Sequence, residues 1–180
     1  MGIHIMLFFQ KKPILAVDCF NLIYKFPELE EMIYRDRLDE AKSGILNILW
    51  EYQVKAKNTK IHAFFDGSKT KGDPATEDFY KGIFTYYSQE KKADDLLKKF
   101  VRFHVSPSLL TVVSSDKEII AYCKKFKCKS QKSEDFAVVI ANFLCPKKED
   151  EEFKNQEKLS KEEFLYWKEV FIKKKDVNKK

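Results

Sequence analysis

The chain has 180 residues, 44% of them hydrophobic and 34% charged, as is typical of a single globular domain with a substantial core. Its net charge of +6 does not by itself indicate nucleic-acid binding, because the last eight residues hold five lysines and one aspartate and so carry +4 of it. The apolar segment 3–9 is only seven residues long and lacks a basic leader and a small-residue cleavage site. We therefore expect an N-terminal extension over 1–12, with no signal peptide and no membrane span.

Four cysteines show neither a CxxC pair nor the regular spacing of a disulfide framework: Cys19, Cys123, Cys128 and Cys145. This pattern predicts reduced thiols in a cytoplasmic protein. A cysteine nucleophile is not indicated, because no histidine is placed to activate Cys19.

Strand-like and helix-like segments alternate along the chain, which is the pattern of an α/β fold with a parallel sheet. The predicted strands are 14–18, 61–66, 83–87, 111–115 and a short extended piece at 129–131. The predicted helices are 27–33, 35–57, 90–103, 116–126 and 133–144. Gly44 weakens the second helix unless it serves close packing. Residues 67–80 are polar with little periodicity, and we predict a loop of the kind that often carries function.

Pro146 marks the end of this pattern and divides the chain into a domain over 13–145 and a C-terminal part over 146–180. Residues 147–158 are dense in both charge signs and are expected to be solvated. A last helix is predicted from Ser160, where Glu163 completes a capping box. Its apolar stripe is expected to dock on the domain, and its end is a basic tail.

Four aspartates follow predicted strands: Asp18, Asp66, Asp94 and Asp116. In an open parallel sheet the carboxyl ends of the strands meet at one edge, where ligands bind. Carboxylates brought together there are costly unless a positive charge neutralises them, and a divalent metal is the usual answer. The pattern therefore predicts a metal site at this edge.

Each aspartate also has a structural explanation. Residues 115–118 can form a capping box, and Asp66 can belong to a turn with the glycine that follows it. Asp94 lies four residues before a lysine, which merely supports a helix, and Asp18 and Asn21 can cap the turn after the first strand. Four acids at four strand exits nevertheless exceed what capping requires, and Asp18 closes the most continuous apolar strand.

Oxygen ligands of this kind suit Mg²⁺ or Mn²⁺, which take one or two carboxylates together with substrate phosphate. Such a metal lowers the pKa of a bound water and stabilises the charge on a reacting phosphodiester. Residues 18–21 contain neither GxGxxG nor GxxxxGK[ST], which argues against a nucleotide cofactor or a kinase.

The order of four short motifs resembles the YacP-like NYN domains, a branch of the PIN-like nucleases. These motifs are Val17-Asp18-Cys19-Phe20-Asn21, Phe65-Asp66, Ala93-Asp94-Asp95 and Ser114-Ser115-Asp116. The resemblance runs from about residue 14 to residue 144. The family commonly has a glycine at the position of Cys19, so we expect a tighter approach of phosphate to that turn. Lys92 stands where the family usually has a threonine, but no acid is missing.

The resemblance implies a Rossmann-like PIN/NYN fold, with strand order 3-2-1-4-5 and flanking helices. It also implies a metal-dependent endoribonuclease that acts on messenger RNA at the ribosome. On this basis Asp18, Asp94 and Asp116 are expected to hold Mg²⁺ or Mn²⁺, with Asn21 beside the first acid. Asp66 matches the aspartate that follows the second strand, and it is expected to orient ligands or water.

The sequence thus predicts hydrolysis of single-stranded RNA by a metal-activated water. Lys69, Lys71 and Lys81 are candidates for contacts with the phosphate backbone, or are ordinary surface lysines. Two other functions stay open. One is a catalytically weak module that binds RNA or the ribosome, and the other is a metal-dependent phosphatase with Asp18 as nucleophile. The phosphatase is disfavoured because Phe20 stands where such enzymes usually have a second aspartate. The sequence predicts no membrane partner and leaves the oligomeric state open.

Overall fold

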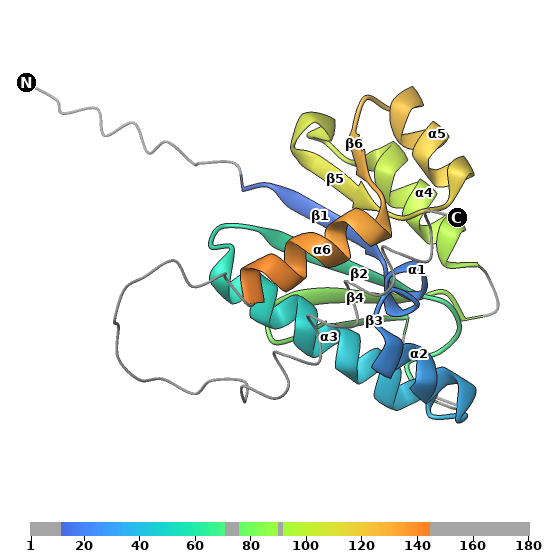
Figure 1. Cartoon of the computed structure of the whole chain (residues 1–180). Coiled ribbons are helices and arrows are strands. Elements are labelled where there is room, and N and C mark those ends of the chain that lie inside the picture. Colours follow the sequence, from blue (N-terminus) through green and yellow to red (C-terminus); the bar gives the residue numbers. More distant parts are fainter. Residues whose placement is uncertain (1–11, 71–75, 90–91, 145–180) are drawn as a thin grey trace, which may run out of the picture.

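Six strands, four of them short and mainly apolar, form one sheet with helices on both of its faces (Figure 1). The computed structural model describes residues 12–70, 76–89 and 92–144. Its strands are β1 (Ile14–Asp18), β2 (Lys60–Phe65), β3 (Glu77–Tyr80), β4 (Ile83–Tyr87), β5 (Leu110–Val113) and β6 (Lys129–Gln131). Its helices are α1 (Cys19–Ile23), α2 (Pro27–Tyr34), α3 (Leu38–Lys55), α4 (Ala93–Phe103), α5 (Lys117–Lys125) and α6 (Ser133–Leu144), with a 3₁₀ turn at Pro107–Leu109.

The strand order is β3-β4-β2-β1-β5-β6. Five of these strands are parallel and have the predicted order 3-2-1-4-5, with β1 between β2 and β5. The exception is β3, which pairs antiparallel with β4 and adds an edge strand to the sheet. The prediction of a loop over the whole of 67–80 is therefore wrong for Glu77–Tyr80. Lys81 and Gly82, both at positive φ, form the two-residue turn that makes this hairpin possible.

Side chains of alternating direction on the parallel strands produce two separate cores. On β1, Leu15 and Val17 belong to the core under α1, α2, α3 and α6, whereas Ala16 belongs to the core under α4 and α5. Because β1 is buried on both faces, its sequence is almost continuously apolar and ends at the first polar residue, Asp18.

The helices agree with their predictions in type but differ at several ends. The predicted helix 35–57 begins only at Leu38, because Asp36 has a φ of 58° and separates α2 from α3. Gly44 serves close packing, since a Cβ there would clash with the Cδ2 atom of Leu29 on α2. The five-residue helix α1 was not predicted. It begins directly after Asp18, at the carboxyl ends of the parallel strands, which we call the active edge of the sheet. The turn that leaves β1 is therefore the start of a helix.

Several sequence predictions fall outside the described residues: the extension over 1–12 apart from its last residue, Lys71, Cys145, and the C-terminal part over 146–180. Within the described part, Cys19, Cys123 and Cys128 are free thiols, as predicted. No helix among the described residues is long and apolar enough to cross a lipid bilayer.

Candidate active site

The acids predicted to converge do lie around the carboxyl ends of the parallel strands. Asp18 ends β1, and Asp66 directly follows β2. Asp116 follows β5 by three residues, and Asp94 lies in the first turn of α4, which begins after β4. Because β4, β2, β1 and β5 run parallel, all four positions lie at the same edge of the sheet.

Asp18 is a buried carboxylate, with 4% of the residue exposed. Three donors hold it: the backbone N–H of Asn21 at 3.1 Å, the Asn21 Nδ2 atom at 2.5 Å and the Ser114 hydroxyl at 2.9 Å. Burial raises the pKa of Asp18 from 3.8 to about 6, although these hydrogen bonds oppose the rise and the charge of Asp94 adds to it. A buried acid of this kind favours a nearby cation, which would restore its ionised form.

Ser114 connects the two strand ends. Its hydroxyl donates to Asp18 and accepts from the backbone N–H of Asp116 at 3.1 Å. The carboxylate of Asp116 in turn accepts from the backbone N–H groups of Glu118 and Ile119, at 2.6 and 3.0 Å, and so caps α5. The predicted capping box is therefore shifted, since Asp116 and not Ser115 is the capping residue. One serine thus fixes the spacing between the loops that carry Asp18 and Asp116.

Asp94 is close enough to the other acids to be affected by their charge. Its pKa is raised, chiefly by partial burial and then by the charge of Asp116, with a further contribution from Asp66. The ammonium of Lys98, one turn along α4, opposes the rise. Lys98 forms an ion pair with Glu118 on α5, at 3.1 Å. The structural explanation of Asp94, an ion pair with Lys98 along the helix, is therefore not the main contact of this lysine. The carboxylates therefore form one electrostatically coupled group.

Asp66 has a different environment from the other acids. Its Oδ1 atom accepts a hydrogen bond of 2.6 Å from the backbone N–H of Ala93, the first residue of α4. The side chain thus joins the end of β2 to the start of the helix that carries Asp94. This contact is more than a local turn, since its partners are 27 residues apart.

The donor set fits a hard divalent cation bound through few protein ligands. Among residues 12–70, 76–89 and 92–144, no three acidic, histidine or cysteine side chains lie close enough to hold a metal by themselves. Mg²⁺ typically takes one or two carboxylates and keeps several waters, so it does not require such a cage. Asp18 supplies the buried carboxylate oxygens, and Asp94 and Asp116 supply further negative charge at the same edge.

The three candidate lysines lie in different places. Lys69 follows β2 at the active edge, where its ammonium forms an ion pair of 2.6 Å with Asp78. Lys81 lies in the turn before β4, at the opposite edge of the sheet, with its ammonium 4.2 Å from the centre of the Trp50 ring. Lys71 lies outside the described residues. Of the two candidate lysines that the structure describes, Lys69 and Lys81, only Lys69 lies at the edge that carries the acids.

The side chain of Cys19 points away from the active edge. It is fully buried in the core under α3 and α6, and burial raises the pKa of its thiol well above the usual value. A nucleophilic role is excluded by this burial, in agreement with the sequence. Because the thiol lies inside, it does not narrow the approach to the turn at residues 18–21 in the way that the sequence suggested.

Two supporting contacts were missed by the sequence-based prediction. Lys42 on α3 is buried and donates from Nζ to the carbonyl oxygen of Ser68 at 2.5 Å, which fixes the loop after Asp66. The hydroxyl of Ser115 bonds to the carboxylate of Glu134 and accepts from the backbone N–H of Ser133, so it joins the active edge to the start of α6. The only sequence signal for these residues was their place in or near the motifs.

Comparisons with known proteins agree with the fold. A profile of the YacP-like NYN domain matches residues 15–174. The crystal structure of Rae1 (YacP) from Bacillus subtilis is similar in fold, with a TM-score of 0.57 and 18% identity over 72% of this chain and 74% of that chain. A mutant of the same protein gives a TM-score of 0.59 and 16% identity over 73% and 76%. A search of curated proteins finds no match. Since the profile covers far more than half of its length, the chain belongs to the YacP-like NYN domain family, a branch of the PIN-like nucleases.

Proposed function

We propose that this protein is a metal-dependent endoribonuclease that hydrolyses phosphodiester bonds in single-stranded RNA. The observation that carries the proposal is the buried carboxylate of Asp18, whose pKa is raised to about 6 at the edge shared with three other aspartates. A buried carboxylate without a cation costs free energy when it is ionised. A bound cation would offset this cost, which explains why an acid is buried at this position. Membership of a nuclease-related family supports the choice of RNA as substrate.

In this proposal Asp18, Asp94 and Asp116 hold Mg²⁺ or Mn²⁺, one or two of them by direct contact and the rest through water that the ion keeps. When bound, the cation supplies Lewis-acid activation of a water and compensates charge on the phosphodiester. Asn21 orients Asp18 through its side-chain amide, and Ser114 does so through its hydroxyl. Because both donors bond to the same oxygen, Oδ2, they fix the orientation of the Asp18 carboxylate at the active edge.

Asp66 acts in this proposal by positioning and not as a ligand. Its oxygen holds the Ala93 amide, which fixes the first turn of α4 and with it the backbone of Asp94. Lys42 fixes the loop that follows Asp66 through the Ser68 carbonyl. Correct placement of a charged group within about 1 Å is worth roughly 100-fold in rate, so these contacts have a direct use in catalysis.

The test is cleavage of an end-labelled, unstructured RNA by the full-length protein with Mg²⁺, with Mn²⁺ or with a chelator. We expect internal cuts only with metal, and none in Asp18→Asn, Asp94→Asn or Asp116→Asn. Asp95→Asn is the matched control, because Asp95 is the exposed neighbour of Asp94 on the same helical turn. The thermal unfolding of each variant establishes that the fold is intact.

Three results would contradict the proposal in different ways. RNA binding by all variants, with no cleavage by wild type under any metal, would indicate a binding module. Release of phosphate from small monoesters would indicate a phosphatase. Cleavage that survives Asp18→Asn would show that the catalytic centre lies elsewhere. Because the family resemblance implies messenger RNA at the ribosome as the target, the assay is repeated with translating ribosomes before a negative result is accepted.

A further inference from the structure

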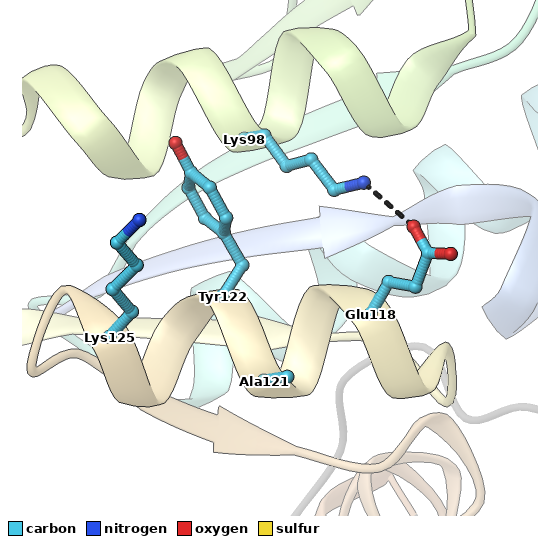
Figure 2. A pocket seen from close by; sticks show the side chains of 5 residues that line it. All are labelled: Lys98, Glu118, Ala121, Tyr122 and Lys125. Carbon is cyan, nitrogen blue, oxygen red and sulfur yellow. Dashed lines mark hydrogen bonds and ion pairs between the residues drawn. The ribbon is translucent and has the colours of Figure 1, made fainter.

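A groove of about 430 Å³ lies between α4 and α5 (Figure 2). It is lined by Lys98, Glu118, Ala121, Tyr122 and Lys125. Tyr122 and Lys125 extend from α5 toward α4, and Lys98 extends from α4 toward Glu118 (Figure 2). The groove is thus an open depression between two helices, with Lys125 toward one end, the Lys98–Glu118 pair toward the other and the Tyr122 ring between them.

One end of the groove lies close to the candidate active site along both helices. Lys98 lies one turn after Asp94 on α4, and Glu118 lies two residues after Asp116 on α5. From there the groove extends along α5 to Lys125, about 10 Å farther at a rise of about 1.5 Å per residue. A polymer whose reacting phosphate lies at the acids therefore has its next units directly over this groove.

We propose that this groove binds the single-stranded RNA segment adjacent to the phosphate that is cut, a proposal that rests on the proposed function. The Lys98 and Lys125 ammonium groups contact backbone phosphates. The Tyr122 ring provides a stacking surface for a base. Lysines that follow the backbone, interleaved with an aromatic ring, are the combination by which proteins hold single-stranded nucleic acid without reading its sequence.

The exposed groups of the groove favour this occupant. Lys125 is exposed, and its ammonium lies 5.9 Å from the centre of the Phe126 ring. Tyr122 is half-buried, with its ring 4.7 Å from that of Phe126, so it is held in place while part of it faces the groove. A fixed ring loses little conformational freedom on binding, which favours its use as a stacking platform.

Glu118 controls how strongly the groove attracts RNA. Its carboxylate is paired with the Lys98 ammonium at 3.1 Å, and 80% of its side chain is exposed. Because this carboxylate is so exposed, the pair contributes little stability, although the Lys98 side chain is itself only 26% exposed, and the carboxylate can give way when a phosphate approaches Lys98. The same carboxylate repels an approaching phosphate, and its removal should therefore strengthen RNA binding.

The experiment measures binding of a fluorescent, unstructured RNA to the full-length protein that carries Asp18→Asn, so that no cleavage occurs. In this background Lys125→Ala should weaken binding and reduce the slope of log affinity against log salt by about 0.7, the value for one phosphate contact on a single strand. Tyr122→Leu should weaken binding about fivefold or more through loss of stacking, whereas Tyr122→Phe should retain it. Glu118→Gln should strengthen binding.

Lys60→Ala is the matched control, because Lys60 is an exposed lysine at the start of β2, at the opposite edge from the acids. The inference is overturned if Lys125→Ala has no larger effect than Lys60→Ala, or if Glu118→Gln weakens binding. The inference remains testable even if Tyr122→Leu fails to fold, because Lys125→Ala and Glu118→Gln are judged independently of it.

If wild type cuts RNA and the groove variants bind like the control, the inference about the groove is wrong and the proposed function stands. If wild type never cuts RNA, the proposed function fails, while the binding result still decides the role of the groove.

Discussion

At the scale of single residues, two carboxylates at the carboxyl ends of the strands have a structural task that is compatible with the proposed metal site. Asp18 caps α1 through the Asn21 N–H, and Asp116 caps α5, yet both carry charge to the same place. The capping interpretation and the metal-site interpretation of the sequence are therefore not exclusive. In Asp116 a single oxygen, Oδ1, accepts both backbone N–H groups, so the cap leaves the other oxygen for a ligand. In Asp18 both oxygens accept hydrogen bonds, and a cation would use their remaining lone pairs.

The role of Asp66 can be separated from that of a metal ligand by one pair of substitutions. Asp66→Asn keeps an oxygen that can accept from the Ala93 N–H, so we expect a kcat close to wild type and an unchanged metal requirement. Asp66→Ala removes the acceptor and frees the start of α4, and we expect kcat to fall by up to about 100-fold. The measurement is kcat as a function of metal concentration. An Asn variant as inactive as the Ala variant, with weaker metal dependence, would instead make Asp66 a ligand.

At the scale of elements, the sequence was sufficient for the parallel strands because their signal is local. Each parallel strand from β1 to β5 is an apolar run of a few residues, and alternation with helices determines that they are parallel. Their order came from the family resemblance, which placed the strand that leads to Asp116 beside β1. Apolar periodicity gave α6 its bounds, Ser133–Leu144, without error.

The elements that were missed have weaker local signals. Most of β3 is exposed, so it lacks the apolar run that marks a buried strand, and it depends on pairing with β4. The helix α1 has five residues and is defined by its contact with Asp18 more than by periodicity. Ser114 bonds to a residue 96 positions away, and Lys42 bonds to one 26 positions away. Local patterns in a single sequence do not indicate such distant pairs.

The cap of α5 yields a prediction on stability and activity together. Asp116→Ala should lower the free energy of unfolding by about 1 kcal/mol, because two backbone N–H groups lose their acceptor. Asp116→Asn should be nearly neutral for stability, since asparagine is an equally good cap. Both variants should be inactive, because both lack the charge. Urea denaturation and RNA cleavage measure the two effects, and activity in Asp116→Asn would reduce Asp116 to a capping role.

At the scale of the whole molecule, the buried Asp18 makes stability depend on pH and on cations. Its pKa is about 6 in the folded protein against an ordinary 3.8, so the folded state keeps its proton where the unfolded state has lost it. The stability of wild type relative to Asp18→Asn should therefore fall as pH rises from about 4 to 6 and then level off. The total change is on the order of 3 kcal/mol. Denaturation of both proteins in chelator across this range checks the sign.

A divalent cation, in contrast, is expected to raise the free energy of unfolding of wild type. At pH 7.5, Mn²⁺ or Mg²⁺ at about 100 times its Kd should stabilise wild type by about 2.7 kcal/mol, because binding to the folded state alone shifts the equilibrium. Asp18→Asn should gain much less, and Asp95→Asn should gain as much as wild type. Equal stabilisation of all three proteins would place the cation away from Asp18.

The hydrogen bond from Ser114 to Asp18 also sets an order of events during synthesis. Its two partners are 96 positions apart, and β1 obtains its second neighbour only when β5 has been made. Contacts between residues so distant in the chain form late, after local helices and hairpins. A nascent chain that ends before Ser114 therefore lacks the bridge between its two strand-end acids. If the protein does cut RNA, it is inert toward the message that encodes it until most of its domain has been translated.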